Sequence, residues 1–243
     1  AQFSMTRVER RDPDLTYNKF DRAGLSELTS NIDWEQYFKT IGLTNVENVV
    51  VGQVDFMKGL NSMLASTPLE DWKTYSKWKL IDAYASDLSA AFVNQSFDFY
   101  QRTLSGTDVM KSREERALRK VNRSLGELVG KAFVERHFPE ESKADVRQMV
   151  ENLRTVFKER VRQLDWMSDE TKEKALEKLD AFNMKIGYPE KWTDFSSLEI
   201  TADNLIQNVM NVRAFSFNKM VSKLGQSVDK DEWFMSPQTV NAY

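Results

Sequence analysis

Apolar residues recur every three or four positions along most of this chain, and that spacing constrains the fold more than any other feature. One such stripe consists of Leu69, Trp72, Tyr75, Trp78, Ile81, Ala85, Leu88 and Phe92. Residues spaced in this way lie on one face of an α-helix. Turn-forming residues are scarce, with 9 Gly and 5 Pro, whereas a β-sandwich or barrel needs a turn after every strand. The sequence therefore predicts an all-α fold of mostly antiparallel helices.

Capping signals mark where several helices begin. Ser112 is followed three residues later by Glu115, which is the pattern of a capping box. Ser168 precedes another amphipathic stretch and can accept a hydrogen bond from its first turn. We expect an extended segment at 46–51 and helices over about 33–42, 55–64, 67–104 with one irregularity near Asn94, 112–139, 142–164, 168–182 and 201–224.

The chain changes character after Gly225. The last residues contain Pro237 and then Thr239–Tyr243, which has the pattern of a strand. We therefore expect a helical domain over residues 1–225 and a short extended tail over 226–243 that enters a different structural unit.

Composition excludes several classes of function. Cysteine is absent, so the chain forms no disulfide, catalytic thiol or thiolate zinc cluster. A single histidine rules out a two-histidine metal motif within these residues. The net charge of −3 removes the electrostatic reason to expect a nucleic-acid partner. The longest apolar run, Ala90–Val93, is far too short for a membrane segment.

Isolated residues that suggest a site have simpler explanations. His137 stands at the predicted end of a helix, where a capping or packing role is the usual one. Asp229, Asp231 and Glu232 are acidic, but their spacing and the missing glycine do not fit a calcium-binding loop. We expect no metal site and no catalytic residue among them.

Two further patterns indicate packing. Gly126 and Gly130 lie four residues apart in a predicted helix, which favours close packing against a neighbouring helix. Trp72, Tyr75 and Trp78 fall on a stripe that continues in both directions, so we expect them in the core and not in a ligand-binding cage.

The C-terminal residues carry a more specific signal. Trp233, Met235 and Pro237 are followed by Val240–Tyr243, and this order resembles the pattern Trp-x-Met-x-Pro and Val-Asn-Ala-Tyr-Tyr of the neprilysin and endothelin-converting-enzyme family of zinc metallopeptidases. Further matches are Leu128–Gly130, Phe133 with Phe138, Leu164–Met167, Thr171, Ala175, Lys178, Leu179 and Lys185–Pro189. The resemblance covers most of the chain from about residue 15 onward.

In that family a thermolysin-like domain binds zinc through His-Glu-x-x-His and a downstream Glu, and a helical domain encloses a chamber that admits peptides. The resemblance implies that residues 1–225 are part of this substrate-gating domain. Residues 226–243 would then be the connector and first strand leading into an absent zinc domain. We thus expect a fragment of a metalloendopeptidase. Its partners would be peptide substrates and the missing catalytic domain. Zinc would be a cofactor of the full-length enzyme, with none expected in this chain.

The resemblance assigns a substrate-binding role to two positions. Asn241 and Ala242 match the family's Asn-Ala pair, which bonds the main chain of a bound peptide. The chemistry agrees, because an Asn amide both donates and accepts hydrogen bonds and a strand edge offers unpaired main-chain groups. Without the resemblance, a solvated strand or turn residue is the favoured interpretation of Asn241.

Vertebrate members of the family are rich in disulfides, so the lack of cysteine suggests a bacterial member similar to peptidase O. Such a protein is expected in the periplasm, exported or at the cell surface, although these residues contain no targeting signal. The alternative is a non-catalytic helical interaction module of the same ancestry. A His-Glu-x-x-His motif encoded after Tyr243 would support the peptidase, and a stop codon there would support the module.

Overall fold

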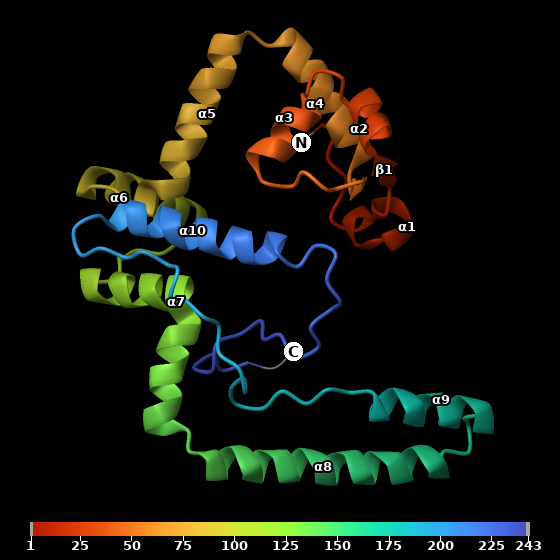
Figure 1. Ribbon diagram of the computed structural model, residues 1–243. Helices are drawn as coiled ribbons and strands as arrows, with labels where there is room; N and C mark the ends of the chain where they lie inside the picture. Colours follow the sequence, from red (N-terminus) through yellow and green to blue (C-terminus); the bar gives the residue numbers. More distant parts are fainter. Residues whose placement is uncertain (1, 242–243) are drawn as a thin grey trace. The chain divides into compact units, whose positions relative to one another are not determined.

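The computed structural model describes residues 2–241 and confirms the predicted all-α class (Figure 1). The chain divides into two compact units, Ala1–Ser105 and Gly106–Tyr243. The domain boundary expected at residue 225 does not coincide with the division between these two units, and it stays a prediction.

The first unit is built from helices and a two-stranded sheet. Its strands β1 and β2 are antiparallel, with Phe20 opposite Val49, which confirms the extended segment expected at 46–51. The elements in chain order are η1 Glu9–Arg11, α1 Pro13–Thr16, β1 Lys19–Asp21, α2 Arg22–Leu28, α3 Trp34–Thr40, β2 Asn48–Val50, α4 Val54–Ser66, α5 Leu69–Tyr84, η2 Ala85–Asp87, α6 Ala90–Ser96 and the π-helical η3 Phe97–Thr103.

A small apolar core holds the N-terminal part of this unit together. Leu25 of α2, Phe38 of α3 and Val51 after β2 are buried against one another. The Asp33 side chain accepts a hydrogen bond from the Gln36 N–H and caps α3, at the start of the helix expected over about 33–42. Burial of the apolar faces of α2 and α3 thus organises the first fifty residues.

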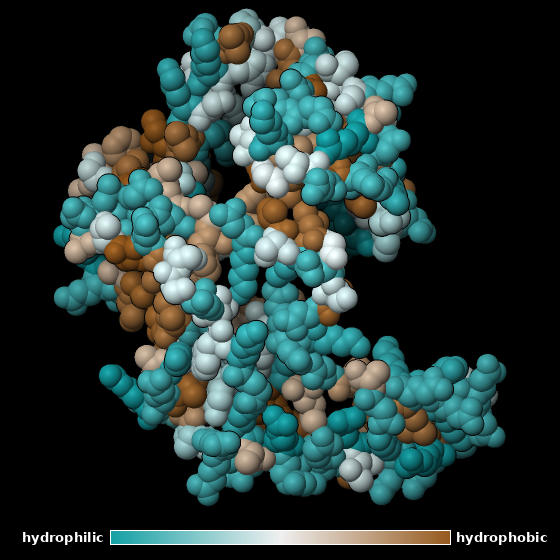
Figure 2. Space-filling view, in the orientation of Figure 1, coloured by the Kyte–Doolittle hydropathy of each residue, from teal (hydrophilic) through white to brown (hydrophobic). Residues whose placement is uncertain are grey.

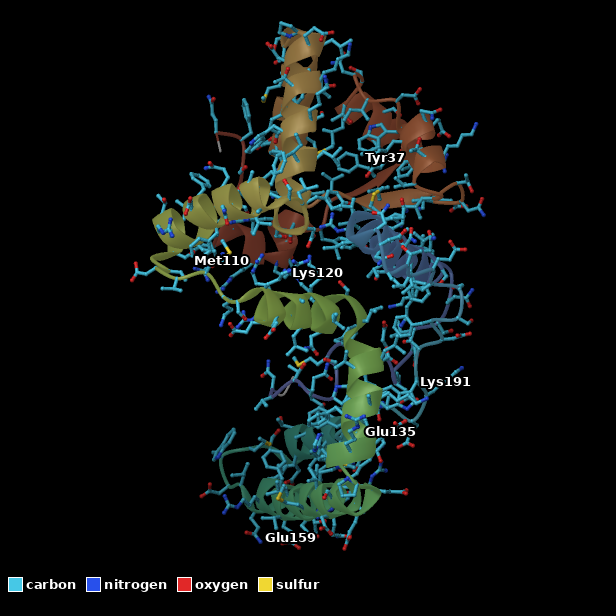
Figure 3. All side chains as sticks on the ribbon, turned by 90° about the vertical axis from the view of Figure 1, so that its left-hand side faces the viewer. Tyr37, Met110, Lys120, Glu135, Glu159 and Lys191 are labelled. Atoms are coloured by element: carbon cyan, nitrogen blue, oxygen red, sulfur yellow. The ribbon has the colours of Figure 1, made fainter. Side chains whose placement is uncertain are left out.

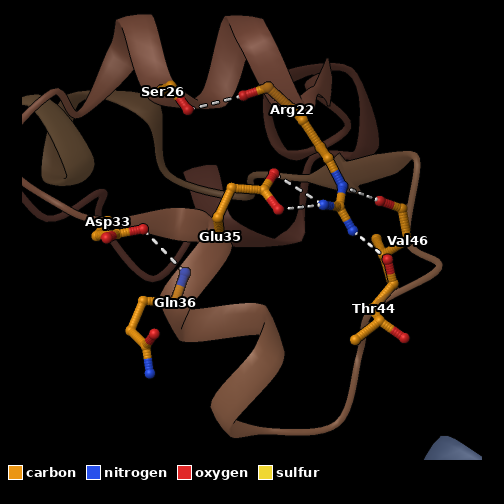
Figure 4. Close-up of polar contacts among 7 residues, drawn as sticks. All are labelled: Arg22, Ser26, Asp33, Glu35, Gln36, Thr44 and Val46. Atoms are coloured by element: carbon orange, nitrogen blue, oxygen red, sulfur yellow. Dashed lines mark hydrogen bonds and ion pairs between the residues drawn. The ribbon is translucent and has the colours of Figure 1, made fainter.

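Arg22 ties three segments around that core. Its Nη1 donates to both carboxylate oxygens of Glu35 at 2.8 and 2.7 Å (Figure 4). Its Nε donates to the Val46 carbonyl at 2.7 Å and its Nη2 to the Thr44 carbonyl at 2.5 Å. The guanidinium therefore links α2, α3 and the loop before β2.

The long helix expected over 67–104 is interrupted. Helix α5 ends at Tyr84, a 3₁₀ turn follows, and α6 begins only at Ala90. Ser86, Asp87 and Ser89 fall in this stretch, and such side chains compete with the helix for backbone hydrogen bonds. The expected irregularity near Asn94 is found slightly later, as the π-helical turn from Phe97.

The aromatic stripe of α5 is not part of a core. The Trp72 and Trp78 rings both contact the Tyr75 ring, with centroids 6.0 Å apart in each pair. Tyr75 and Trp78 are about half exposed, and no residue of α5 is buried. The prediction that this trio lies in the core is wrong for Tyr75 and Trp78, whereas Trp72 is half-buried and its Nε1 atom is covered.

The second unit contains four longer helices, which are α7 Arg113–His137, α8 Glu140–Gln163, α9 Asp169–Asp180 and α10 Leu205–Val221. Helices α8 and α9 lie side by side as an antiparallel pair (Figure 1). The capping box at Ser112 and Glu115 and the cap at Ser168 are confirmed. Residues 222–241 form turns and irregular backbone.

One face of α8 is apolar and open. Met149, Leu153, Val156 and Phe157 share a face by their spacing, and each is about half exposed or more. Hydrophobic residues reach the visible surface of the molecule in several patches between hydrophilic ones (Figure 2). No helix among residues 2–241 has both the length and the apolar character that crossing a membrane requires.

Candidate functional site

The two residues expected to bind substrate stand at the end of the chain. Asn241 is exposed, and its N–H donates to the Thr239 carbonyl at 3.1 Å. Residues 239–241 belong to no strand, so the strand predicted there is not present in the part of it that is described. Ala242 lies outside the described residues. The substrate-binding role of Asn241 and Ala242 stays a prediction.

The segment before Asn241 is seated on helix α7. Gly130 is buried, and a Cβ built on it would lie 2.4 Å from Cδ of Pro237. A Cβ on Gly126 would lie 3.3 Å from Oγ of Ser236. The two glycines therefore form a shallow groove that receives the side chains of residues 236–238. Close packing is as predicted, but the partner is a turn and not the neighbouring helix that was expected.

Helix α7 bends where this segment contacts it. Leu125 has non-helical angles, φ −132° and ψ 34°, and the ribbon changes direction between the half that carries Lys120 and the half that carries Glu135 (Figure 3). Gly126 follows directly, and a side chain from outside the helix bonds its carbonyl. Glycine and an inserted hydrogen-bonding group are both recognised causes of a kink.

That inserted group is the amide of Gln238. Its Nε2 donates to Oδ1 of Asn122 and to the Gly126 carbonyl, both at 3.0 Å. Asn122 is held in turn, because its Nδ2 donates to the Leu118 carbonyl at 3.1 Å. The opposite atom of the glutamine amide, Oε1, is buried without a hydrogen-bond partner among the described residues. The amide orientation is therefore set by two acceptors on α7.

Further contacts fix the same segment upstream. The Asn183 side chain donates to the Lys230 carbonyl at 2.8 Å and to Oδ1 of Asp231 at 2.7 Å. Nζ of Lys185 donates to the Glu232 carbonyl at 2.6 Å. The Glu232 carboxylate also forms an ion pair with Lys223. The segment is thus held at both its beginning and its end.

A polar cleft of about 480 Å³ lies between α7, α10 and residues 233–239. At its wall, Glu127 accepts the Thr193 N–H and the Thr193 hydroxyl, each at 2.5 Å. Nζ of Lys219 donates to the same hydroxyl at 2.8 Å. Thr193 therefore links a carboxylate on α7 to an ammonium on α10, and this fixes the two helices beside the segment.

The described residues do not fit a zinc site. Within 2–241 no three His, Cys, Asp or Glu side chains gather into a group that could hold a metal ion. His137 is exposed at the end of α7, and its ring lies 5.2 Å from the ring of Phe133. Asp231 and Glu232 are engaged by Asn183 and Lys223. That this chain holds no zinc stays a prediction.

Sequence analysis did not single out Gln238 or Asn122. They are 116 residues apart in the chain, and no local pattern connects them. The only available signal was the glycine pair, because a groove on a helix indicates that something packs closely there. The resemblance named Leu128–Gly130 and the C-terminal residues as separate matches, whereas the structure brings them into contact at Gly130 and Pro237.

Comparison with known proteins identifies the family. A model of peptidase family M13 matches residues 1–189. The chain is 30% identical to human endothelin-converting enzyme-like 1 over 96% of its own length, and 30% identical to human neprilysin over 97%. It spans 31% and 34% of those two proteins, so it corresponds to about a third of the curated relatives it matches.

Solved structures support the same family assignment. The open state of the Mycobacterium tuberculosis zinc metalloprotease ZMP1 superposes on all of this chain with a TM-score of 0.91 and 39% identity, and the chain covers 38% of that protein. This confirms the resemblance to the neprilysin and endothelin-converting-enzyme group, and the family match extends over most of the sequence. The chain belongs to peptidase family M13, a family of zinc metallopeptidases.

Proposed function

We propose that this chain is the helical, substrate-gating part of a zinc metalloendopeptidase that hydrolyses peptides. The zinc ligands and the general base belong to the remainder of that enzyme. Asn241 and Ala242 bind the main chain of the peptide. The observation that carries the proposal is the seating of residues 236–238 on α7, because it holds the residues just before Asn241 at a defined place on a helical framework.

The length of the relatives supports a further domain. Known members of the family are about three times as long as this chain. The open face of α8, with Leu153 and Phe157 each more than half exposed, is the kind of apolar surface that a partner covers. We assign the missing catalytic domain as the partner that covers apolar faces of this region.

The location follows from the same reasoning. We propose an exported, periplasmic or cell-surface bacterial enzyme. The proposal draws on the likeness to a mycobacterial metalloprotease and on the lack of cysteine.

The test uses the complete gene product. We expect it to hold one zinc, to cleave a fluorogenic peptide, to lose that activity to a chelator, and to leave a folded protein intact. Asn241→Ala should raise KM for the peptide, since a main-chain contact is lost, whereas Gln226→Ala at an exposed position of the same region should not. A gene product that ends at Tyr243, or that binds no zinc, would instead support the non-catalytic interaction module.

A further inference from the structure

Gln238 occupies the middle of a turn that directs the chain toward Asn241. The turn is closed by the Thr239 N–H, which donates to the Ser236 carbonyl at 2.9 Å. The Ser236 and Thr239 hydroxyls lie 3.1 Å apart, and Pro237 restricts the backbone because its ring fixes φ. The turn is therefore a rigid unit, and its orientation is set by whatever holds its side chains.

The Gln238 amide is the group that holds it. Both acceptors of its Nε2, Oδ1 of Asn122 and the Gly126 carbonyl, belong to α7. The main-chain carbonyl cannot donate, and the Asn122 amide is oriented by the bond from its Nδ2 to the Leu118 carbonyl, which leaves Oδ1 facing Gln238. Only a donor at position 238 satisfies both acceptors, so a carboxylate of the same size would face two oxygens.

The distance from this contact to Asn241 is short. Three residues span at most about 11 Å of extended chain, and Thr239 and Val240 between them are exposed. Upstream of Gln238, Pro237 and Ser236 pack against Gly130 and Gly126, and the Glu232 contacts lie nine residues before Asn241. A shift at Gln238 therefore passes directly to Asn241, whereas a shift at Glu232 is absorbed by the turn seated on α7.

We propose that Gln238 is a positioning residue for peptide binding: through Asn122 and the Gly126 carbonyl it fixes the turn that sets where Asn241 meets the peptide main chain. This inference rests on the proposed function. It assigns the helical unit a direct part in substrate binding, because α7 holds the turn that leads to Asn241. The kink of α7 and the position of Asn241 are then coupled through one amide.

The kinetic test uses the full-length, zinc-loaded gene product with a fluorogenic peptide. We expect Gln238→Glu to raise KM about tenfold and to change kcat less than twofold. The variant weakens a contact that the peptide makes equally in the ground state and in the transition state, and such a loss raises KM without lowering kcat. Gln226→Glu makes the same chemical change at an exposed position and should leave both constants unaltered. Gln238→Ala and Asn122→Ala should each raise KM, and the double variant should raise it no further than the larger single effect.

Hydrogen exchange on the same proteins reports the geometry independently of activity. The amides of Thr239 and Asn241 should exchange faster in Gln238→Glu than in the unaltered protein, with α8 and α9 unchanged. An unaltered KM, a fall in kcat alone, or independent effects of Gln238→Ala and Asn122→Ala would each overturn the proposal. If the unaltered gene product cleaves no peptide, the proposed function fails and so does this role, while exchange still shows whether Gln238 holds the segment.

Discussion

Gly130 of α7 and Pro237 of the C-terminal segment are in direct contact, and only a hydrogen at the Gly130 α-carbon allows it. A Cβ there would lie 2.4 Å from Cδ of Pro237 and 2.8 Å from Oε1 of Gln238, distances that packed atoms do not adopt. The contact joins two stretches of sequence more than a hundred residues apart, and both match the family pattern. It explains why a helix carries a buried glycine.

The first prediction concerns that contact. Gly130→Ala is expected to lower the free energy of unfolding by about 1–3 kcal/mol, the usual cost of overpacking, measured by urea denaturation. Gly126→Ala should cost much less, because its Cβ would lie 3.3 Å from a movable Ser236 hydroxyl and alanine favours a helix. Gly52→Ala, whose nearest atom is 3.8 Å away, is the control. Equal free energies of unfolding for Gly130→Ala and the unaltered protein would contradict this account.

Local signals predicted much of the fold. The capping box at Ser112 and the cap at Ser168 depend on residues within a few positions of one another, and a run of β-branched residues marks the extended segment around Asn48–Val50. Side chains that cap a helix act on the backbone next to them. The sequence is therefore sufficient to place these elements to within a few residues.

Contacts between distant segments were not predictable in this way. The pairing of Gln238 with Asn122 depends on how α7 bends, and nothing near either residue reveals it. The core assignment of Trp78 failed because periodicity identifies an apolar face but not whether another element covers it; that side chain is half exposed. A substrate-binding role for Asn241 and Ala242 is predicted by the family resemblance alone, because the residue pattern by itself favours a solvated strand or turn residue at Asn241.

The second prediction concerns Arg22 in the first unit. Arg22→Lys should lower the free energy of unfolding by about 1–2 kcal/mol, since a lysine ammonium cannot reach two carbonyls and a carboxylate together. Most of that loss comes from the Thr44 and Val46 carbonyls, because Glu35 is 73% exposed and an exposed ion pair contributes little. Arg10→Lys, on the surface of the same unit, is the matched control. If Arg22→Lys lowers the free energy of unfolding no more than Arg10→Lys does, the several donors of the guanidinium do not contribute to stability.

The third prediction concerns the buried ammonium of Lys143. Its Nζ donates to the Tyr188 carbonyl at 3.0 Å and to Glu190 at 2.6 Å, and it lies 3.9 Å from the centre of the Tyr188 ring. Lys143→Met keeps the volume but leaves that carbonyl without its donor, so we expect a loss of about 1–3 kcal/mol in thermal or urea unfolding. Lys191→Met, at an exposed position of the same unit (Figure 3), should have little effect.

The fourth prediction is a pH dependence that arises from the same contact. The hydrogen bond from Lys143 and then its positive charge lower the pKa of Glu190 from its ordinary value of 4.5. A lowered pKa in the folded state stabilises the fold above the unfolded value. This contribution should be present above pH 4.5 and disappear as the pH falls through the lowered pKa. In the Glu190→Gln variant, the free energy of unfolding should fall less steeply as the pH drops below 4.5. The Glu173→Gln variant, altered on the surface of α9, should show the same pH dependence as the unaltered protein.

The last prediction concerns zinc. A catalytic zinc needs three protein ligands and an open position for water, and residues 2–241 provide no group of three potential ligands. The lone imidazole of His137 has no second histidine to join it, and carboxylates alone suit calcium and magnesium better than zinc. Purified chain 1–243 is therefore expected to retain no stoichiometric zinc after loading and desalting, by elemental analysis, and to cleave no fluorogenic peptide. The complete gene product, treated in parallel, should retain one. A tightly held zinc in the 243-residue chain, together with chelator-sensitive cleavage, would refute the assignment of the catalytic machinery to the rest of the enzyme.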